Sequence, residues 1–426
     1  MILFYRALTN LFYPILVLII FFRKLAKKED QKRYKEKIFS SNYNVKKNNK
    51  LKLIWFHAAS IGELKSIIPI IDQLNVRENS LEFLVTTITL SSANLAKIKF
   101  KNNNNIHHRF IPIDVKFLIV KFLDLWKPKA IFLVDSEIWP NLISVVKEKK
   151  IPLAILNARI TNKTFNRWRF VSSFAESLFG SFDLCLTSNF ETKEYLENLN
   201  AKNIHYIGNI KFCETIKKNI KNNNEIFLTS KNFWLAASTH NGEENFCLLT
   251  HLEIKKDMKN IVTIIAPRHV NRSADIKKLC DGYNLNCQIL NSGDHILEDR
   301  EIVIINSYGI LSSFFKNSKS VFIGKSNIKK LKNVGGQNPI EAVKLGCKVY
   351  HGPFVYNFKE VYKILEKNNV SKEVNSPEEL ARCLLLDFKI NGVKDLKFAK
   401  TIDNLGQKIL SESLKKINNF LIYENK

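Results

Sequence analysis

The apolar positions along this chain follow two alternating spacings, and residues 51–74 show the change most clearly. The stretch LKLIWFHAA at the start is almost continuously apolar, which is typical of a strand buried on both faces. A short turn at Ser60 and Gly62 follows, and apolar residues then recur every three or four positions up to residue 74. The pattern predicts a strand, a tight turn and a helix, which together form one βα unit.

The same βα pattern repeats along most of the sequence in two series. The first series runs from residue 51 to about 208, and the second from 233 to about 352. Alternation of this kind predicts parallel sheets covered by helices, and hence an α/β protein. Residues 211–232 lose the alternation and are expected to link the two series. No GxGxxG sequence follows the first strand, so a dinucleotide-binding domain in the strict sense is not predicted.

These changes of pattern set the expected domain boundaries. A chain of 426 residues is too long for one ordinary core, which agrees with two domains. The last apolar pattern predicts a helix that could pack back on the first domain. We therefore expect five segments: an N-terminal membrane anchor with its basic flank (1–30), a first Rossmann-like domain (31–210), a linker (211–232), a second Rossmann-like domain (233–400) and a C-terminal helical segment (401–426).

The N-terminal stretch, residues 2–22, is apolar apart from Arg6, Asn10 and Pro14. About 20 apolar residues are needed for a helix that crosses the hydrocarbon core of a bilayer. No basic region precedes the stretch and no small-residue cleavage site follows it, which argues against a signal peptide. Residues 23–37 are rich in Lys and Arg, which favours the cytoplasmic side. We expect a membrane anchor that spans or lies on the membrane; the alternative is a buried amphipathic helix.

The chain as a whole is strongly basic. It has 66 Lys and Arg residues against 40 Asp and Glu, which gives a formal charge of +26. Such a charge favours anionic partners: acidic membranes, nucleic acids or phosphorylated substrates. The aromatic residues, however, fall inside apolar strand and helix patterns and do not interleave with basic residues in a base-stacking motif. We therefore expect no nucleic-acid partner, and a basic nucleic-acid-binding protein is the rival hypothesis from another functional class.

The seven cysteines are scattered along the chain, and no two of them form a CxxC pair. This usage predicts reduced thiols that face the cytosol. No group of His, Cys and carboxylate residues has the spacing typical of metal ligands. The sequence therefore predicts neither a disulfide framework nor a metal site.

Three polar residues gather around the turn of the first βα unit. In open α/β sheets, ligands bind at the carboxyl ends of the strands, where this turn is expected. His57, Ser60 and Glu63 are therefore predicted to surround the mouth of a site. A structural explanation remains open, because Ser is a common helix cap and Glu in a first turn offsets the helix dipole. A single His at a strand end is often structural as well.

In the second series, two predicted strands end in polar residues. Ser238, Thr239 and His240 follow the first strand of the series, and Arg268 and His269 follow the next. Because the carboxyl ends of parallel strands meet at one edge of a sheet, we expect these residues on the ligand side of the second sheet.

The sequence KNVGGQNPIE predicts a second polar turn before a helix. Asn338 as N-cap, Pro339 at the first helical position and Glu341 at the third would form a capping box. Gly335 and Gly336 would let a ligand approach the backbone, and free N–H groups at a helix start favour a phosphate. Glu341 would suit the hydroxyls of a ribose. A sugar-nucleotide site and a purely structural turn are both compatible with these residues.

Eight short segments, spread over nearly the whole chain, are distinctive in their sequence and order: WFHAASIGE, DSEIWPNLI, LNARI, GNIKF, AASTHNGEE, APRH, FIGKS and GGQNPIEAVKLGCKVYHGPFVYNF. In this order they resemble the Kdo transferase family, bacterial glycosyltransferases that move 3-deoxy-D-manno-octulosonic acid (Kdo) from CMP-Kdo to the lipid A precursor. The resemblance implies a GT-B fold, in which two Rossmann-like domains face each other across a cleft, with an N-terminal membrane-anchor helix. It also implies an inverting enzyme that needs no metal or other cofactor, on the cytoplasmic face of the inner membrane.

The resemblance assigns roles to individual residues. Glu63 resembles the family's general base, Glu137 and Arg159 resemble acceptor-side or structural groups of the cleft, and Arg268 matches a position suited to the phosphate of CMP. Together with the residues discussed above, the expected acceptor-side set is His57, Ser60, Glu137 and Arg159, and the expected donor-binding set is Lys211, Ser238, Thr239, His240, Arg268, His269, Gly324, Lys325, Gly335, Gly336, Asn338 and Glu341.

Five positions depart from the family pattern. Cys213 stands where an acidic residue is usual, and Asn306 and Ile310 replace two carboxylates. Asn241 stands where a glutamate is common, and Lys325, which replaces a glycine, adds positive charge near the expected nucleotide. The departures do not affect Glu63 or the Asn-Pro-Ile-Glu turn. Another GT-B transferase that uses a UDP-sugar is the alternative among enzymes.

Overall fold

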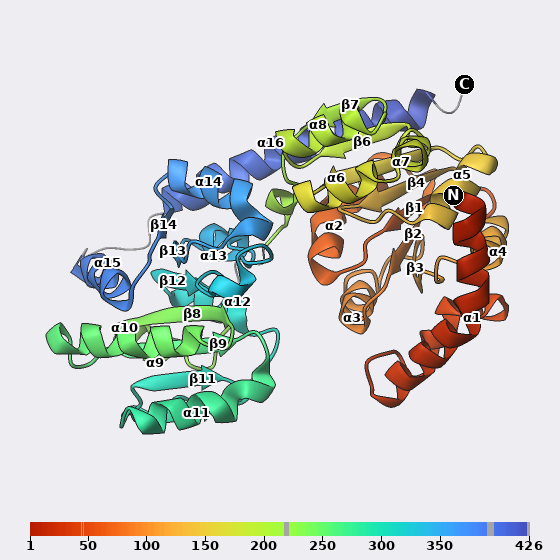
Figure 1. Cartoon of the computed structure of the whole chain (residues 1–426). Coiled ribbons are helices and arrows are strands. Elements are labelled where there is room, and N and C mark those ends of the chain that lie inside the picture. The colour runs from red at the N-terminus through yellow and green to blue at the C-terminus, as the bar shows by residue number, and fades with distance from the viewer. Residues whose placement is uncertain (44, 46, 217–220, 390–395, 424–426) are drawn as a thin grey trace. The chain divides into compact units, whose positions relative to one another are not determined.

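In the computed structural model the chain forms two compact units (Figure 1). Unit 1 consists of Met1–Glu214 and Gly406–Lys426, and unit 2 of Thr215–Leu405. The structure describes residues 1–43, 45, 47–216, 221–389 and 396–423. Each unit contains one seven-stranded sheet, so the two series of βα units seen in the sequence correspond to two separate sheets.

Unit 1 is built on a parallel sheet with the strand order β3-β2-β1-β4-β5-β6-β7. Its strands are β1 (Lys52–His57), β2 (Leu81–Thr87), β3 (Ile106–Phe110), β4 (Ala130–Val134), β5 (Leu153–Ala158), β6 (Leu184–Thr187) and β7 (Ile204–Tyr206). The helices between them are α2 (Ile61–Arg77), α3 (Leu90–Lys99), α4 (Lys116–Trp126), α5 (Pro140–Glu148), α6 (Asn162–Arg169), α7 (Ser172–Phe179) and α8 (Phe190–Asn198). All residues of β1 after Lys52 are buried, as expected for a strand covered on both faces.

Aromatic side chains pack against both faces of the sheet in unit 1. Successive residues of a strand point to opposite faces, so Trp55 and Phe56 enter different layers of the core. The Trp55 ring lies 5.0 Å from that of Phe122 on α4. On the other face Phe56 stacks on Phe132 at 4.8 Å, and the Phe132 ring lies 5.5 Å from that of Phe420. Phe420 belongs to α16 (Leu396–Tyr423), so the end of the C-terminal helix completes the core of unit 1.

Unit 2 repeats this architecture in a parallel sheet with the order β10-β11-β9-β8-β12-β13-β14. Its strands are β8 (Phe233–Thr239), β9 (Val262–Pro267), β10 (Cys287–Leu290), β11 (Ile302–Ile305), β12 (Ser320–Ile323), β13 (Lys348–His351) and β14 (Ser371–Glu373). The helices are α9 (Glu225–Ser230), α10 (Glu243–Asp257), α11 (Ser273–Gly282), α12 (Leu311–Asn317), α13 (Ile340–Lys344), α14 (Lys359–Lys367) and α15 (Pro377–Lys389). The predicted fold class, an α/β protein with two Rossmann-like sheets, is confirmed.

Each sheet has one point at which the direction of strand addition reverses. In unit 1 this point lies between β1 and β4, and in unit 2 between β8 and β12. Ligands of open α/β sheets bind at the carboxyl ends of the two strands that flank such a point. The topology therefore directs attention to the residues after β1 and β4 in unit 1, and to those after β8 and β12 in unit 2.

The N-terminal helix α1 (Ile2–Leu25) lies along unit 1 beside α4 and α5 (Figure 1). The Tyr5 hydroxyl donates a hydrogen bond of 3.0 Å to Asp114 Oδ2. Two turns further along α1, the Tyr13 ring meets the ring of Phe117, in the first turn of α4, edge to face at 5.2 Å. Ile20, near the other end of the helix, is buried in a small apolar cluster. The helix is therefore attached to unit 1 along most of its length.

The segment between the two series contains secondary structure at both ends. The 3₁₀ helix η3 (Ile210–Cys213) belongs to unit 1 and α9 belongs to unit 2, while residues 217–220 lie outside the described part of the chain. The C-terminal helix α16 begins at Leu396, earlier than the apolar pattern predicted. Only its part from Gly406 onward is in unit 1, so one continuous helix contributes to both units.

Candidate functional site

Glu63 lies in the first turn of α2, where its carboxylate closes a capping arrangement. The Ser60 side chain accepts a hydrogen bond of 3.3 Å from the backbone N–H of Glu63. In return, the Ser60 hydroxyl donates to Glu63 Oε1 at 2.7 Å, and the N–H of Ala59 donates to Oε2 at 2.7 Å. The structural role foreseen for Ser60 is thus present. A carboxylate has about four acceptor sites, so Glu63 can still accept a further proton or hydrogen bond.

The environment of Glu63 raises the pKa of its carboxyl group. Burial is the largest cause, and the negative charges of Asp135 and Glu137 act in the same direction, while the Ser60 hydrogen bond opposes them. The position at a helix start alone suggested that the ionised form would be favoured. The structure corrects this expectation, because the loss of hydration outweighs the capping bonds. A raised pKa makes the carboxylate a stronger proton acceptor once it is ionised.

His57 does not lie at the mouth of a site, in contrast to the prediction. It is fully buried at the end of β1, where its Nδ1 lies 2.9 Å from Thr86 Oγ1. Its Nε2 faces Glu137 Oε2 at 3.5 Å, which is longer than an ordinary hydrogen bond. The Trp139 indole N–H donates to the same carboxylate at 2.7 Å. Trp139 therefore orients Glu137, and the expectation that His57 lies at the mouth of a site was wrong, because burial depends on the neighbouring strands.

Lys211 lies in unit 1, where it pairs with a residue that the sequence did not single out. Its ammonium group lies 2.8 Å from Asp135 Oδ2, and both side chains are largely buried. The backbone N–H of Arg159 donates to the carbonyl of Asp135 at 3.3 Å. Asn157 holds the adjacent segment, because its Oδ1 accepts a hydrogen bond of 3.0 Å from the N–H of Ile210. Lys211 is thus placed with the acceptor-side residues, and its expected contact with the donor stays a prediction.

Left-handed backbone conformations mark the same edges of both sheets. Asp135 and Asn157 have φ angles of 66° and 55° at the ends of β4 and β5. Ser238 and Lys325 have φ angles of 58° and 59° at the ends of β8 and β12. Non-glycine residues in this region are strained, and such residues are concentrated at functional sites. Seven other non-glycine residues of the described chain share this conformation elsewhere, so it is the topology that directs attention to these edges.

In unit 2, the Glu243 carboxylate holds the loop after β12. It accepts backbone hydrogen bonds from Lys325 and Ser326 at 2.6 and 2.8 Å. Two further N–H groups, those of Asn327 and His240, donate to it at 2.9 Å. Burial raises the pKa of Glu243, and the backbone hydrogen bonds oppose the shift. Glu243 was not among the predicted site residues, although the pair of acids after Gly242 was a signal.

Close packing requires a glycine at position 324. A Cβ atom there would lie 2.6 Å from the Ser238 carbonyl oxygen and 2.7 Å from the Cα of Thr239. The carboxyl ends of β8 and β12 are therefore in contact through Gly324. Thr239 itself is buried, and its Oγ1 has no hydrogen-bond partner among the described residues. These contacts bring three of the predicted donor-side residues together.

Arg268 and the two histidines lie around this edge. The N–H of Arg268 donates to the Thr239 carbonyl at 3.0 Å, while its side chain is exposed. The His240 and His269 rings lie 6.0 Å apart, edge to face. Burial lowers the pKa of His240, and the charges of Lys325 and His269 act in the same direction. An exposed guanidinium beside a mostly neutral imidazole can bind an anion.

The glycine-rich turn before α13 has a structural explanation. A Cβ atom on Gly335 would lie 2.1 Å from the Phe354 carbonyl oxygen, and Gly336 has a φ of 90°. Helix α13 spans Ile340–Lys344. The Asn338 Oδ1 accepts a 3.0 Å hydrogen bond from the Ile340 N–H, two residues further on, which is the bond that an N-cap side chain makes, so Asn338 caps this helix as predicted.

Oε1 of the Glu341 carboxylate accepts a hydrogen bond from the Ser312 hydroxyl on α12. Two of the departures from the family pattern also have structural roles. The Cys213 thiol donates to the Gly406 carbonyl at 3.3 Å, and Asn306 bonds to Ser273 at 3.1 Å. These positions are therefore used for packing within their units.

Comparison with known proteins decides the family. A family model described as 3-deoxy-D-manno-octulosonic-acid transferase (kdotransferase) matches residues 32–214. The Arabidopsis thaliana protein named probable 3-deoxy-D-manno-octulosonic acid transferase, mitochondrial, is 31% identical over 380 residues, which cover 86% of this chain and 82% of that protein. The chain belongs to the 3-deoxy-D-manno-octulosonic acid transferase family. The relative from Rickettsia bellii (strain RML369-C) is 29% identical over 426 residues, 98% of this chain and 99% of its own.

Family membership makes this chain a glycosyltransferase, as the resemblance implied. Among solved structures, UDP-GlcNAc 2-epimerase from Neisseria meningitidis, bound to UDP-GlcNAc, aligns with a TM-score of 0.56 at 12% identity, covering 88% of this chain and 100% of that chain. Anabaena HepE in complex with UDP and glucose aligns with a TM-score of 0.54 at 10% identity, covering 87% and 100%. At these identities the likeness shows the fold alone, and it confirms the GT-B class for the Kdo transferase family member described here.

Proposed function

We propose that this enzyme transfers Kdo from CMP-Kdo to the lipid A precursor, with inversion at the anomeric carbon and without a metal ion. The observation that carries the proposal is the position of Glu63 in a chain of this family. Its half-buried carboxylate lies at the reversal point of the unit 1 sheet, near two further acids that raise its pKa. Among the described residues no three His, Cys or acidic side chains group as metal ligands, and metal independence stays a prediction.

Glu63 acts as the general base in this proposal. The acceptor hydroxyl gives its proton to the Glu63 carboxylate while its oxygen forms a bond to the anomeric carbon of Kdo. The bond from that carbon to the phosphate oxygen breaks at the same time, and CMP leaves as an anion. A single displacement of this kind inverts the anomeric configuration. Glu137, held by Trp139, and Arg159 are available to position the acceptor.

Unit 2 supplies the donor-side groups. The exposed Arg268 guanidinium is suited to the phosphate of CMP. Glu243 fixes the loop that carries Lys325, which adds a second positive charge at the same sheet edge. Asn338 and Glu341 are assigned to the nucleotide as the family pattern implies, Glu341 to the ribose hydroxyls.

We also propose that α1 attaches the enzyme to the cytoplasmic face of the inner membrane and lies in the plane of that surface. By length and composition α1 could cross a membrane. Its polar side chains, however, contact unit 1: Tyr5 bonds to Asp114, and Arg6 forms an ion pair with Glu148 at 2.5 Å. Near the middle of the helix, the Tyr13 hydroxyl donates to a backbone carbonyl of unit 1. A helix held in this way cannot stand across a bilayer without breaking these contacts.

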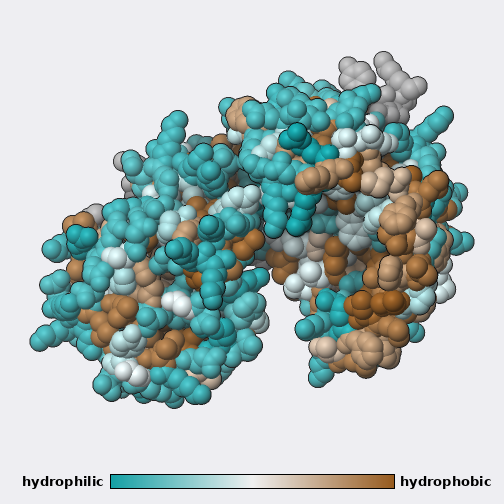
Figure 2. Space-filling model, in the orientation of Figure 1, coloured by the Kyte–Doolittle hydropathy of each residue, from teal (hydrophilic) through white to brown (hydrophobic). Residues whose placement is uncertain are grey.

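The opposite face of α1 is apolar and exposed. Figure 2 shows hydrophobic residues gathered over this part of unit 1. The face consists of ten large apolar side chains between 41% and 74% exposed: Leu3, Phe4, Leu11, Phe12, Ile15, Leu18, Ile19, Phe21, Phe22 and Leu25. Amphipathic helices of this kind bury their apolar face at the boundary between headgroups and acyl chains.

The deciding experiment is mass spectrometry of the lipid products after incubation with CMP-Kdo and the lipid A precursor. A mass increase of one or more Kdo units, absent when CMP-Kdo is replaced by UDP-sugars, supports the proposal and also counts the sugars. A binding comparison of CMP, UDP and single-stranded RNA accompanies it. Preferential, strongly salt-dependent binding of RNA without any product would overturn the assignment.

A further inference from the structure

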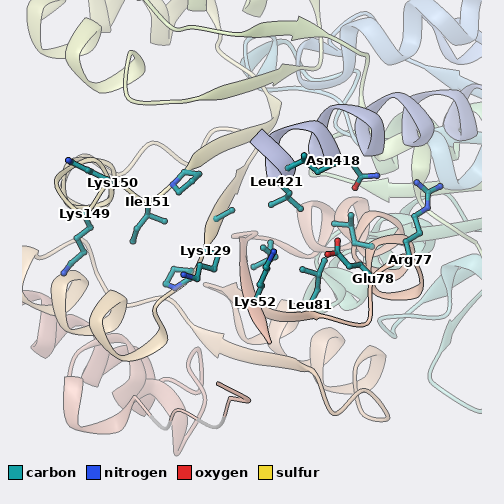
Figure 3. A pocket seen from close by; sticks show the side chains of 16 residues that line it. Lys52, Arg77, Glu78, Leu81, Lys129, Lys149, Lys150, Ile151, Asn418 and Leu421 are labelled. Carbon is teal, nitrogen blue, oxygen red and sulfur yellow. The ribbon is translucent and has the colours of Figure 1, made fainter. Parts of the chain in front are cut away.

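Unit 1 contains a cavity of about 630 Å³ at the edge of its sheet where the strands begin, opposite the carboxyl edge at which Glu63 lies. It lies where β1, β2, β4 and β5 begin, whereas Glu63 follows the carboxyl end of β1. A volume of this size suits a small organic ligand. Figure 3 shows α16 over the cavity, with Asn418 and Leu421 facing it. None of the residues that line this cavity belongs to the site described above.

The cavity combines apolar walls with a cationic mouth. Buried residues such as Ile54, Leu81 and Ala130, from the first residues of three neighbouring strands, form the walls. Leu421 of α16 adds apolar surface from the other side. The cations are five exposed side chains spread along the opening (Figure 3): Lys52, Arg77, Lys129, Lys149 and Lys150.

Acidic residues compensate little of this charge. Among the described residues that line the cavity, Glu78 is the one acid, and it accepts a hydrogen bond of 2.9 Å from Ser80. Lys149 is paired with Asp124 at 2.5 Å, outside the lining. Within the described part of the chain, the ammonium group of Lys129 takes part in no ion pair, and the same holds for Lys150.

Helix ends explain only part of the cluster. Cations near a helix C-terminus offset the helix dipole, which accounts for Arg77 at the end of α2 and for Lys149 and Lys150 after α5. Lys129 likewise follows the end of α4 by three residues, whereas Lys52 begins β1, where no helix dipole requires it. Like charges repel, and such a cluster stabilises an anion that binds among them.

We infer that this cavity is a binding site for an organic phosphate, a phosphate group joined to an apolar body. The lysines at the mouth bind the phosphate oxygens, and the Asn418 amide offers a neutral donor. The apolar body fills the space between the strand starts and Leu421. Because α16 forms one wall, the bound ligand also holds the C-terminal helix against the sheet. The phosphate can belong to a soluble metabolite or to the headgroup of a membrane lipid.

Calorimetric titration with hexyl phosphate tests the inference on the full-length protein, with saturating CMP present to occupy the donor site. The variant K129E/K150E should bind hexyl phosphate at least about tenfold more weakly, because two attractive charges become repulsive. K129R/K150R should stay within about threefold of the unchanged protein, since Arg keeps the charge. Inorganic phosphate, which has no apolar body, should bind at least about tenfold more weakly than hexyl phosphate.

A matched control separates the cavity from the general basic charge. K101E/K121E reverses two exposed lysines of unit 1 outside the cavity and should leave hexyl phosphate binding within about threefold of the unchanged protein. Equal losses in K101E/K121E and K129E/K150E, or no binding at all by the unchanged protein, would overturn the inference. Kdo transfer is measured separately on each variant, so failure here is distinguishable from failure of the proposed reaction.

A second arm identifies the source of the phosphate. Vesicles of phosphatidylcholine with and without dioleoyl phosphatidate are titrated with the unchanged protein, K129E/K150E and K101E/K121E. Selective loss of the phosphatidate-dependent binding in K129E/K150E identifies a lipid headgroup. If K129E/K150E loses hexyl phosphate binding but keeps the phosphatidate-dependent binding to vesicles, the ligand is a soluble one. If both control and cavity variants behave alike in both arms, no phosphate site exists in this cavity.

Discussion

At the scale of single residues, the Glu63 carboxylate has a structural role and a proposed chemical one. It closes the N-terminal capping arrangement of α2 through hydrogen bonds from Ser60 and Ala59. It is also partly desolvated and shares its surroundings with Asp135 and Glu137. The two roles are compatible because neither capping bond transfers a proton to the carboxylate. They make different predictions, however, once the carboxylate is replaced by an amide.

Glu63→Gln should reduce turnover of CMP-Kdo at least about a hundredfold, because a positioned base contributes about 10²- to 10⁴-fold. CMP affinity, measured by calorimetry, should remain within about threefold, since most of the proposed donor contacts lie in unit 2. The free energy of unfolding should change by only about 1 kcal/mol, because the lost hydrogen bond is offset by removal of a desolvated charge. Near-normal turnover would leave Glu63 a capping residue and direct the search to Glu137.

The acid limb of the pH profile should report the same carboxyl group. Glu63 must be ionised to accept a proton, and its pKa is raised above the ordinary 4.5. The value of kcat/KM should therefore fall, as pH decreases, at a pH above 4.5. Glu137→Gln removes one of the charges that raise this pKa, so the limb should move to lower pH while burial keeps it above the ordinary value. An unshifted limb in Glu137→Gln would show that the charge of Glu137 does not affect the titrating group.

The raised pKa of Glu63 also affects the stability of the protein. The dependence of this contribution on pH is opposite to that of an ordinary salt-bridged acid. Because the folded-state pKa of Glu63 exceeds the unfolded value, its contribution to stability is fully present below the unfolded pKa. That contribution is lost as pH rises through the folded pKa. The side chain of Glu63→Gln does not titrate. As pH rises through the folded-state pKa of Glu63, the variant should therefore become more stable relative to the unchanged protein. Urea denaturation at several pH values measures the difference.

At the scale of elements, Glu243 of α10 holds the loop after β12, which belongs to the proposed donor site. Glu243→Gln should weaken CMP binding at least about tenfold and destabilise unit 2 by about 3 kcal/mol, because four backbone N–H groups lose a carboxylate acceptor. Calorimetry and urea denaturation provide the two readouts. Glu253→Gln, on the exposed side of the same helix, is the matched control and should change neither quantity by much. Unchanged CMP affinity in Glu243→Gln would separate this loop from the nucleotide site.

The helix α1 allows an equally specific test of membrane attachment. L11S/L18S/F22S alters only exposed apolar side chains and keeps the contacts of Tyr5, Arg6 and Tyr13 with unit 1. Binding to phosphatidylcholine vesicles should fall at least about a hundredfold, since each large apolar side chain contributes about 1.5–3 kcal/mol on burial. Vesicle co-sedimentation gives the measurement.

The control for this test removes equally exposed apolar side chains elsewhere. V76S/I226S/L386S alters residues that are 79%, 86% and 62% exposed, outside α1. These changes should leave vesicle binding unaffected. If the control variant lost binding to the same extent, the attachment would not be specific to α1.

At the scale of the whole molecule, the formal charge of +26 adds a second, weaker attraction to anionic membranes. This attraction is electrostatic and should disappear at high salt, where the screening length falls from about 10 Å at 0.1 M to about 3 Å at 1 M. L11S/L18S/F22S should therefore keep salt-sensitive binding to vesicles that contain phosphatidylglycerol and lose it at 1 M salt. The unchanged protein should remain bound to both vesicle types at 1 M salt. Release of the unchanged protein at 1 M salt would show that charge, and not α1, provides the attachment.

The apolar pattern was sufficient to predict the two series of strands and helices as far as β13, because apolar periodicity reflects which face of each element is buried. The short edge strand β14 lies beyond the predicted second series. The sequence by itself also determined local arrangements such as the Ser60–Glu63 cap, whose partners are three residues apart. The eight ordered segments were sufficient for the family. At the start of α13 the capping bond of Asn338 was predicted, whereas the bond between Glu341 and Ser312 was not, because it joins residues 29 positions apart.

Which distant residues share an environment became known from the folded structure alone. His57 proved to be buried because β2 and β4 pair with β1 on either side, a fact that no local pattern contains. The pairing of Lys211 with Asp135 joins residues 76 positions apart, and the raised pKa of Glu63 depends on acids from another strand end. Burial and Coulomb interaction act through space, so they follow from the packing of the sheet and not from spacing along the chain.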